Sequence, residues 1–172
     1  MPLLIVAPLE AAPPDLRRLE AIRGRHDPQH AIIAAHVTLV FGFETPDEAT
    51  AAAHLATIVA HQGAIALRLS SFVAVPDALG GRSHVFAVPD QGRAEIEDLH
   101  DRLYAGPLAG GLRADIPFIP HVTVAARDHH DEAEDLVREL GRIGMPARLP
   151  CLDLIAFDGA QVTPLRRFAL QA

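Results

Sequence analysis

The chain has 172 residues, 49% of them hydrophobic and 22% charged, which excludes bulk disorder and collagen-like structure. A formal net charge of −7 argues against a broad grip on duplex DNA or long RNA, which needs a basic face. No apolar run reaches the roughly 18 residues of a membrane span, and a single cysteine, Cys151, excludes an intrachain disulfide. We therefore expect one cytoplasmic domain that spans residues 1–172.

Apolar and β-branched runs predict the strands, and proline or capping residues mark the helix starts. The first run has no basic residue ahead of it, so we interpret it as a strand rather than a secretory signal. In the first half, the order is a strand at Leu3–Pro8, a helix after Pro13 that Asp15 caps and Gly24 ends, a strand at Ala31–Phe43, a helix opened by the capping box Thr45–Glu48, and a strand at Ile65–Val75.

The second half repeats this alternation of strands and helices. In chain order it predicts a turn at Leu79–Gly81, a strand at Ser83–Pro89, a helix opened by Asp90 and ended at Gly106, a segment Asp115–Arg127 that leads into a strand, a helix at Asp131–Leu140, and final strands at Leu149–Phe157 and Leu165–Leu170. Pro150 favours an edge position for its strand, because proline cannot donate to a sheet ladder.

An internal repeat is the most informative feature of the sequence. The tetrapeptide His36–Leu39 recurs as His121–Val124, 85 residues later, and the helix start at Asp47 has its counterpart at Asp131, 84 residues on. A shared tetrapeptide alone can arise by chance, whereas a motif and a helix start in matching order are much harder to produce that way. The repeat predicts a duplicated fold made of two pseudo-symmetric lobes.

Strand alternation places the polar residues of each motif on one face. His36 and Thr38 point together. The opposite face carries Val37, Leu39 and Phe41. In the second copy, one face carries His121, Thr123, Ala125 and Arg127. If an approximate two-fold axis relates the halves, the two His–Thr pairs face each other across a cleft.

Two facing His–Thr pairs suit phosphate-ester chemistry. A neutral imidazole can take a proton from water, and an imidazolium can donate one to the leaving oxygen; the unperturbed pKa of histidine, about 6.5, allows both forms near neutral pH. The hydroxyls of Thr38 and Thr123 can bond the phosphoryl oxygens, and Arg127 can add a charge-assisted bond. One His-x-Thr is usually structural, but two in equivalent positions of a repeat indicate a site.

These residues give the chain a resemblance to a known superfamily. With HVTLVFG at His36–Gly42 and FIPHVTVAAR at Phe118–Arg127, it resembles the two-histidine (2H) phosphoesterases, especially their bacterial 2′–5′ RNA ligase-like and cyclic nucleotide phosphodiesterase-like branch. The resemblance extends over nearly the whole chain. It implies a bilobal α+β fold with two antiparallel sheets lining a central cleft and helices packed outside.

The resemblance also implies the chemistry. The motif histidines His36 and His121 would be the catalytic acid and base, and the two motif threonines the phosphate ligands. The substrate would be an RNA or nucleotide end with a 2′,3′-cyclic phosphate or a 2′–5′ linkage, and no metal or other cofactor would be needed. Related sequences commonly carry an arginine where this chain has Ala126. Arg127 lies on the His121 face only if no β-bulge interrupts the strand.

Two alternatives stay open at this point. The first is a metal-dependent hydrolase, which would use the two adjacent histidines of the run Asp128–Asp131 as metal ligands. The other interpretation of the same run is an ordinary acidic helix N-terminus. A non-catalytic module that binds an RNA end or a nucleotide would use the same His–Thr residues. The residues that we expect at the surface are His26, His100, Arg17, Arg18, Arg23 and Arg25, and the alternative for these arginines is to guide an RNA end into the cleft. His84 alternates with Phe86 on one face of its strand and lies either at the surface or near the cleft. The phenylalanines considered for base stacking, each expected in the core, are Phe43, Phe72, Phe86 and Phe118.

Overall fold

The structure is a computed structural model that describes residues 1–78 and 80–172, so Leu79 of the predicted turn lies outside the described residues. The helices are α1 (Pro13–His26), α2 (Glu48–Val59), α3 (Arg93–Leu103) and α4 (His130–Leu140), with a short 3₁₀ helix, η1, at Gly106–Gly111. The strands are β1 (Leu3–Pro8), β2 (Glu10–Ala11), β3 (His36–Phe43), β4 (Ile65–Pro76), β5 (Ser83–Gln91), β6 (Val122–Arg127), β7 (Arg142–Leu149), β8 (Cys151–Phe157) and β9 (Val162–Ala169). None of the described helices is both long and apolar enough to cross a membrane.

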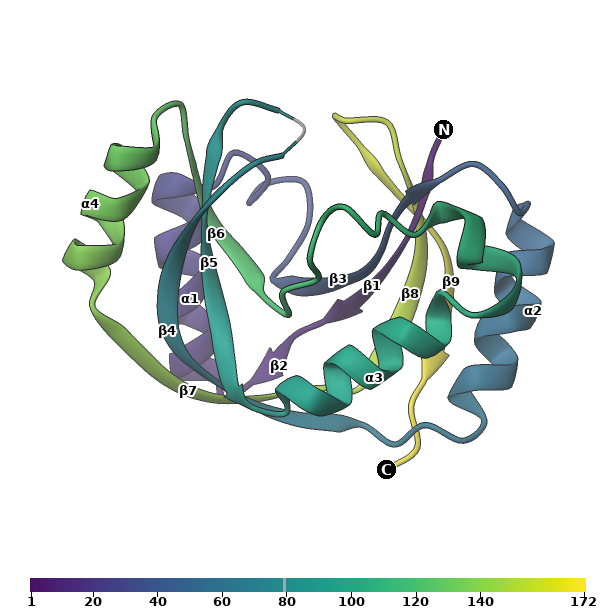
Figure 1. Ribbon diagram of the computed structural model, residues 1–172. Coiled ribbons are helices and arrows are strands. Elements are labelled where there is room, and N and C mark those ends of the chain that lie inside the picture. The colour runs from purple at the N-terminus through teal and green to yellow at the C-terminus, as the bar shows by residue number, and fades with distance from the viewer. Residues whose placement is uncertain (79) are drawn as a thin grey trace.

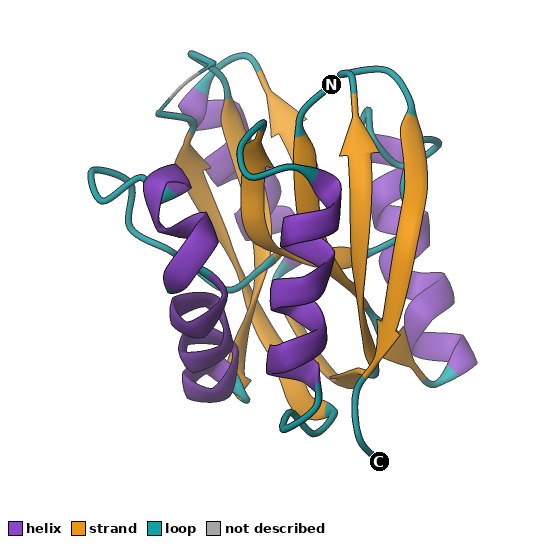
Figure 2. Ribbon diagram, turned by 90° about the vertical axis from the view of Figure 1, so that its right-hand side faces the viewer, coloured by secondary structure: helices purple, strands orange, loops and turns teal. Residues whose placement is uncertain are grey.

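The strands form two antiparallel sheets. One sheet has the order β3-β1-β8-β9, and the other has the order β2-β7-β4-β5-β6. The motif strands β3 and β6 lie at sheet edges and contact each other, near the middle of the molecule in Figure 1. Helices α1 and α4 pack on the five-stranded sheet, α2 contacts β9, and α3 contacts β3. A second view shows helices in front of and behind the strands (Figure 2). The predicted α+β class, with two antiparallel sheets and outer helices, is confirmed.

Each sheet contains a strand from the other half of the chain. The order β3-β1-β8 in one sheet corresponds to β6-β5-β4 in the other. Strand β4, which follows the first motif, therefore pairs with β5 beside the second motif, and β8 pairs with β1 beside the first. The two halves of the chain are interlocked through these strands.

The final third of the chain departs most from the sequence expectation. Strand β7 is not predicted, because Gly144 and Pro146 interrupt its apolar alternation. The predicted strand at Leu149–Phe157 is in fact the end of β7 and the whole of β8, with Pro150 between them. The expected edge position is wrong, since β8 lies between β1 and β9. Proline is tolerated here because it stands where one strand ends and the next begins.

Arg23 is buried, which corrects the expectation of a solvated basic cluster on the first helix. The residue is 1% exposed, and its guanidinium donates to Asp27 Oδ2 at 2.9 and 3.0 Å, to Glu20 at 3.1 Å and to the carbonyl of Ile33 at 2.8 Å. Glu20 also accepts from the backbone N–H of Ala35 at 2.8 Å. This ion network ties the end of α1 to the segment that enters β3.

Replacing Arg23 tests that network. Arg23→Met is expected to lower the free energy of unfolding by about 3 kcal/mol, because it leaves the Glu20 and Asp27 carboxylates without their buried partner. Urea denaturation at pH 7 measures the change. Arg25→Met, at an exposed position of the same helix, is the control and should shift stability by less than about 0.5 kcal/mol. Equal effects of the two substitutions would contradict the role given to Arg23.

Candidate active site

The first motif presents a histidine and a threonine on one face of β3. His36 pairs with Pro8 and Thr38 with Val6, and both side chains are half-buried. The Nδ1 atom of His36 lies 2.8 Å from the carbonyl oxygen of Ala34, to which it donates. In the neutral ring this fixes the proton on Nδ1 and leaves Nε2 as an acceptor.

The second motif repeats this geometry. The Nδ1 atom of His121 donates to the carbonyl of Ile119 at 2.5 Å, again two residues earlier. Thr123 pairs with Phe86 of β5 and is half-buried like Thr38. Within the described part of the chain, neither imidazole Nε2 and neither threonine hydroxyl has a protein hydrogen-bond partner. Each motif therefore offers one free imidazole nitrogen and one free hydroxyl.

A β-bulge follows the threonine in both motifs. In β3 the pairing moves from Val6↔Thr38 to Ile5↔Val40, so Leu39 is the extra residue. In β6 it moves from Phe86↔Thr123 to Val85↔Ala125, so Val124 is extra. A bulge places two residues opposite one and shifts the alternation of faces beyond it. Simple alternation counted from the threonine therefore fails for the residues directly after the bulge.

The bulge turns Arg127 away from the two histidines. Arg127 pairs with the buried Ser83, on the opposite face from Thr123. Its guanidinium lies 2.7 Å from His26 Nδ1 and donates to the carbonyl of Ala126 at 2.9 Å. It lines a cavity of about 370 Å³ whose other residues are His26, Glu132, Asp135, Leu136 and Glu139. Because carboxylates repel an anion, this position of Arg127 does not favour the phosphate-binding role, which stays a prediction.

Phe41 is also placed differently from the expectation. Beyond the bulge in β3 it no longer shares the buried face of Val37 and Leu39, and 64% of its surface is exposed. Its backbone N–H donates to the hydroxyl of Tyr104 at 3.0 Å, a bond that holds the outer edge of β3. A free strand edge therefore gains a partner from the end of α3.

An aromatic ring covers the His121 imidazole. The rings of Phe86 and His121 are stacked with centroids 3.5 Å apart and planes 17° apart. The ring centroid of His84, two residues before Phe86 on β5, lies 6.0 Å from that of Phe86. Phe86 is thus half-buried in the site rather than in the core, and His84 is half-buried beside it. The alternation of His84 and Phe86 along one strand is the sequence signal for this shared face, and the place near the site is the alternative that it left open for His84.

Burial lowers the pKa of both motif histidines. At His121 burial is the largest cause, the positive charges of His36 and His84 add to it, and the Ile119 carbonyl opposes it; together they lower the pKa to about 4. At His36 burial again comes first, with the Ala34 carbonyl opposing it and Arg23 adding to it. Because protonation of one ring disfavours protonation of the other, the two imidazoles titrate as a coupled pair.

The metal-dependent alternative finds no support in this arrangement. His130 contacts Ser83 Oγ at 3.1 Å and lies 3.6 Å from Glu134, while Asp128 pairs with Arg82. Among the described residues, no three metal-ligating side chains converge.

His100, expected at the surface, is instead buried, and its ring stacks on that of Phe118 with centroids 3.8 Å apart.

A model of the 2′–5′ RNA ligase superfamily matches residues 8–159. The chain belongs to this superfamily, that of the 2H phosphoesterases. A relative from Bacillus pumilus, named "Putative phosphoesterase", is 33% identical over 120 residues, which cover 69% of this chain and 67% of that protein. A relative from Oceanobacillus iheyensis with a similar name is 30% identical over 131 residues, which cover 73% of this chain and 69% of that one.

Solved structures share the fold of this superfamily member at lower sequence identity. Escherichia coli LigT complexed with 3′-AMP has a TM-score of 0.61 and 21% identity, with all of both chains covered. The protein TT0787 of Thermus thermophilus has a TM-score of 0.67 and 17% identity, covering 99% of this chain and 98% of that one. These likenesses establish the fold, and the superfamily places the chain among the phosphoesterases.

The stacked Phe86 ring generates a prediction for His121. Phe86→Leu is expected to raise the pKa of His121 from about 4 toward the ordinary histidine value of about 6.5, because water then reaches the uncovered face of the imidazole. An NMR titration of the His121 Cε1–H signal measures this. Phe72→Leu, which changes a buried phenylalanine of β4, is the matched control and should leave that pKa in place. An unchanged His121 pKa in Phe86→Leu would show that the stack is not what covers the ring.

Proposed function

We propose that the protein is a cyclic phosphodiesterase that opens 2′,3′-cyclic phosphate ends of RNA or nucleotides by two-histidine acid–base catalysis. The observation that carries the proposal is the matched pair of free Nε2 atoms, each on a ring held by a backbone carbonyl and each accompanied by a free threonine hydroxyl. Ligation that forms a 2′–5′ bond is the same ring opening with a ribose 5′-hydroxyl in place of water: the bond from phosphorus to O5′ forms and the bond to O3′ breaks.

Two proton transfers complete the reaction. The Nε2 atom of one neutral imidazole takes a proton from water as the water oxygen bonds to phosphorus. The bond from phosphorus to one ribose oxygen breaks, and that oxygen takes a proton from the other ring, which enters as imidazolium. Thr38 and Thr123 donate to the non-bridging oxygens, where negative charge accumulates. The products are a phosphomonoester and a ribose hydroxyl.

Binding of the substrate phosphate would allow one histidine to be charged while the other stays neutral. In the empty site, burial favours the neutral form of both His36 and His121. A bound phosphate anion raises the pKa of an imidazole beside it, so one ring can become charged while the repulsion between the rings keeps the other neutral. The two motifs are equivalent in their contacts to the backbone, so we assign the acid and base to the pair rather than to single residues.

The comparisons support a nucleotide substrate. LigT was crystallised with 3′-AMP, a nucleoside monophosphate of the kind that opening of a 2′,3′-cyclic phosphate yields, and also with ATP. The fold of the present chain matches LigT over its full length. We therefore expect a nucleotide or RNA end, rather than a lipid or protein phosphoester, to be bound at the His–Thr face.

Alanine substitution of the histidines tests the mechanism. His36→Ala and His121→Ala are each expected to lower kcat on a nucleoside 2′,3′-cyclic phosphate by at least about 100-fold, since positioned acid–base groups contribute about 10²–10⁴-fold. Chromatography of the phosphomonoester product measures the rate. His129→Ala, at an exposed position outside both motifs, is the control. Near-normal turnover in either motif variant would reject the mechanism, and nucleotide binding with no turnover by the native protein would indicate a binding module.

Removal of metal ions tests the cofactor question separately. Turnover of the same substrate is expected to persist after dialysis against EDTA, because the two imidazoles perform the proton transfers and the hydroxyls bind the phosphate. Activity is compared before dialysis, after it, and after addition of Mg²⁺, Mn²⁺ or Zn²⁺. Loss of activity that one of these ions restores would favour a metallohydrolase.

A further inference from the structure

A second polar group lies on the same face of the four-stranded sheet as Thr38. Directly paired residues of neighbouring antiparallel strands share a face. Thr38 of β3 pairs with Val6 of β1, Val6 pairs with Asp153 of β8, and Asp153 pairs with Arg167 of β9. These four residues therefore form one row across the sheet, with the motif threonine at one end and an arginine at the other.

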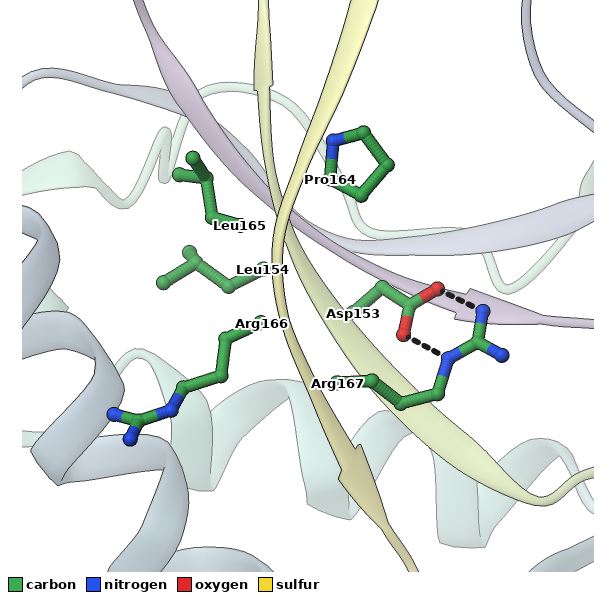
Figure 3. A pocket seen from close by; sticks show the side chains of 6 residues that line it. All are labelled: Asp153, Leu154, Pro164, Leu165, Arg166 and Arg167. Atoms are coloured by element: carbon green, nitrogen blue, oxygen red, sulfur yellow. Dashed lines mark hydrogen bonds and ion pairs between the residues drawn. The ribbon is translucent and has the colours of Figure 1, made fainter.

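The arginine of this row is held in place but remains open to solvent. Arg167 Nε donates to Asp153 Oδ1 and Nη2 donates to Oδ2, both at 2.7 Å (Figure 3). The side chain of Asp153 is 15% exposed, whereas that of Arg167 is 67% exposed. A guanidinium has five N–H donors, so this fork–fork pair leaves three for a ligand. A rotamer already fixed by Asp153 loses little freedom on binding.

The neighbouring arginine on β9 has the opposite orientation. Arg166 pairs with Leu154 and points to the other side of the strand in Figure 3, with its guanidinium 5.7 Å from the ring of Phe168. Among the described residues of these four strands, Arg167 is thus the one arginine on the Thr38 face. A cavity of about 170 Å³ adjoins it, lined by Asp153, Leu154, Pro164, Leu165, Arg166 and Arg167.

We propose that Arg167, oriented by Asp153, is a second phosphate subsite that binds the backbone of an RNA substrate whose cyclic end lies at the His–Thr pairs. This inference rests on the proposed function. The backbones of Thr38 and Arg167 are three strand spacings apart, roughly 14 Å, a separation that suits two phosphates of one chain better than a single one. The subsite therefore takes another phosphate of the same chain, and the enzyme favours an oligonucleotide over a mononucleotide.

The charge of Asp153 shapes this selectivity. It neutralises the net charge of the pair, so Arg167 adds little long-range attraction for anions. Its remaining donors act only when a phosphate reaches contact distance, where a charge-assisted hydrogen bond forms. Discrimination by Arg167 thus depends on the length and path of the RNA and not on a general basic field, in agreement with the net charge of −7.

Substrate length gives the test. The ratio of kcat/KM for a tetranucleotide that ends in a 2′,3′-cyclic phosphate to kcat/KM for the corresponding cyclic mononucleotide is measured for the native protein, Arg167→Gln and Arg166→Gln. We expect Arg167→Gln to lower the ratio about tenfold, mainly through the KM of the tetranucleotide, as loss of a hydrogen bond to a charged group predicts. Arg166→Gln should keep the native ratio. Thermal unfolding verifies that both variants are folded.

A binding measurement separates this inference from the proposed function. Fluorescence anisotropy with a labelled tetranucleotide 3′-phosphate, competed by unlabelled tetranucleotide 3′-phosphate or nucleoside 3′-monophosphate, gives the same length ratio without catalysis. If the native protein hydrolyses neither cyclic substrate, the proposed function fails, and the anisotropy ratio still decides the role of Arg167. A ratio that is the same in the native protein and in Arg167→Gln overturns the second subsite, whether or not the enzyme is active.

Discussion

The hydrogen bond from each imidazole Nδ1 to a backbone carbonyl two residues earlier is the contact on which the candidate site depends. It fixes the neutral tautomer and holds the ring, and it leaves Nε2 as a free acceptor. The carbonyl on the His36 side belongs to a segment that the buried Arg23 network attaches to α1. The buried Arg23 network thus holds the segment that carries the hydrogen-bond acceptor of the His36 ring.

Strand periodicity predicts much of this molecule. Strand β1 lies where the sequence places it, and the pairing of His with Thr on one face follows from alternation alone. The same rule fails at Phe41 and Arg127, because a bulge depends on how two strands register and leaves no local trace in either strand. The burial of Arg23 also has no sequence signal, since its partners become adjacent only when α1 packs beside the segment before β3. Local patterns predict the strands and helices and the faces of the motif residues. The pairing between strands decides which face the residues after the motif occupy.

The two copies of the motif share their backbone contacts but not their surroundings. His121 lies under an aromatic ring, with a third histidine nearby. His36 instead lies near the Arg23 ion network, in which Arg23 lowers the pKa of the imidazole and Asp27 and Glu20 raise it. Burial is the largest cause of the lowered pKa at both rings, while the charged neighbours that modify it differ between the two copies. Substitutions around one ring need have no counterpart around the other.

The interlocked strands have a consequence for how the molecule is assembled. Strand β4 completes the sheet of the second motif, and β8 completes that of the first, so neither half of the chain can close its own sheet. A half-length polypeptide would expose open ladder edges, which invite association with another chain. If the halves descend from one ancestral gene, that ancestor could have reached this architecture as a domain-swapped dimer, in which each copy gave one strand to the sheet of the other. Fusion of the two copies would then place both exchanged strands in a single chain.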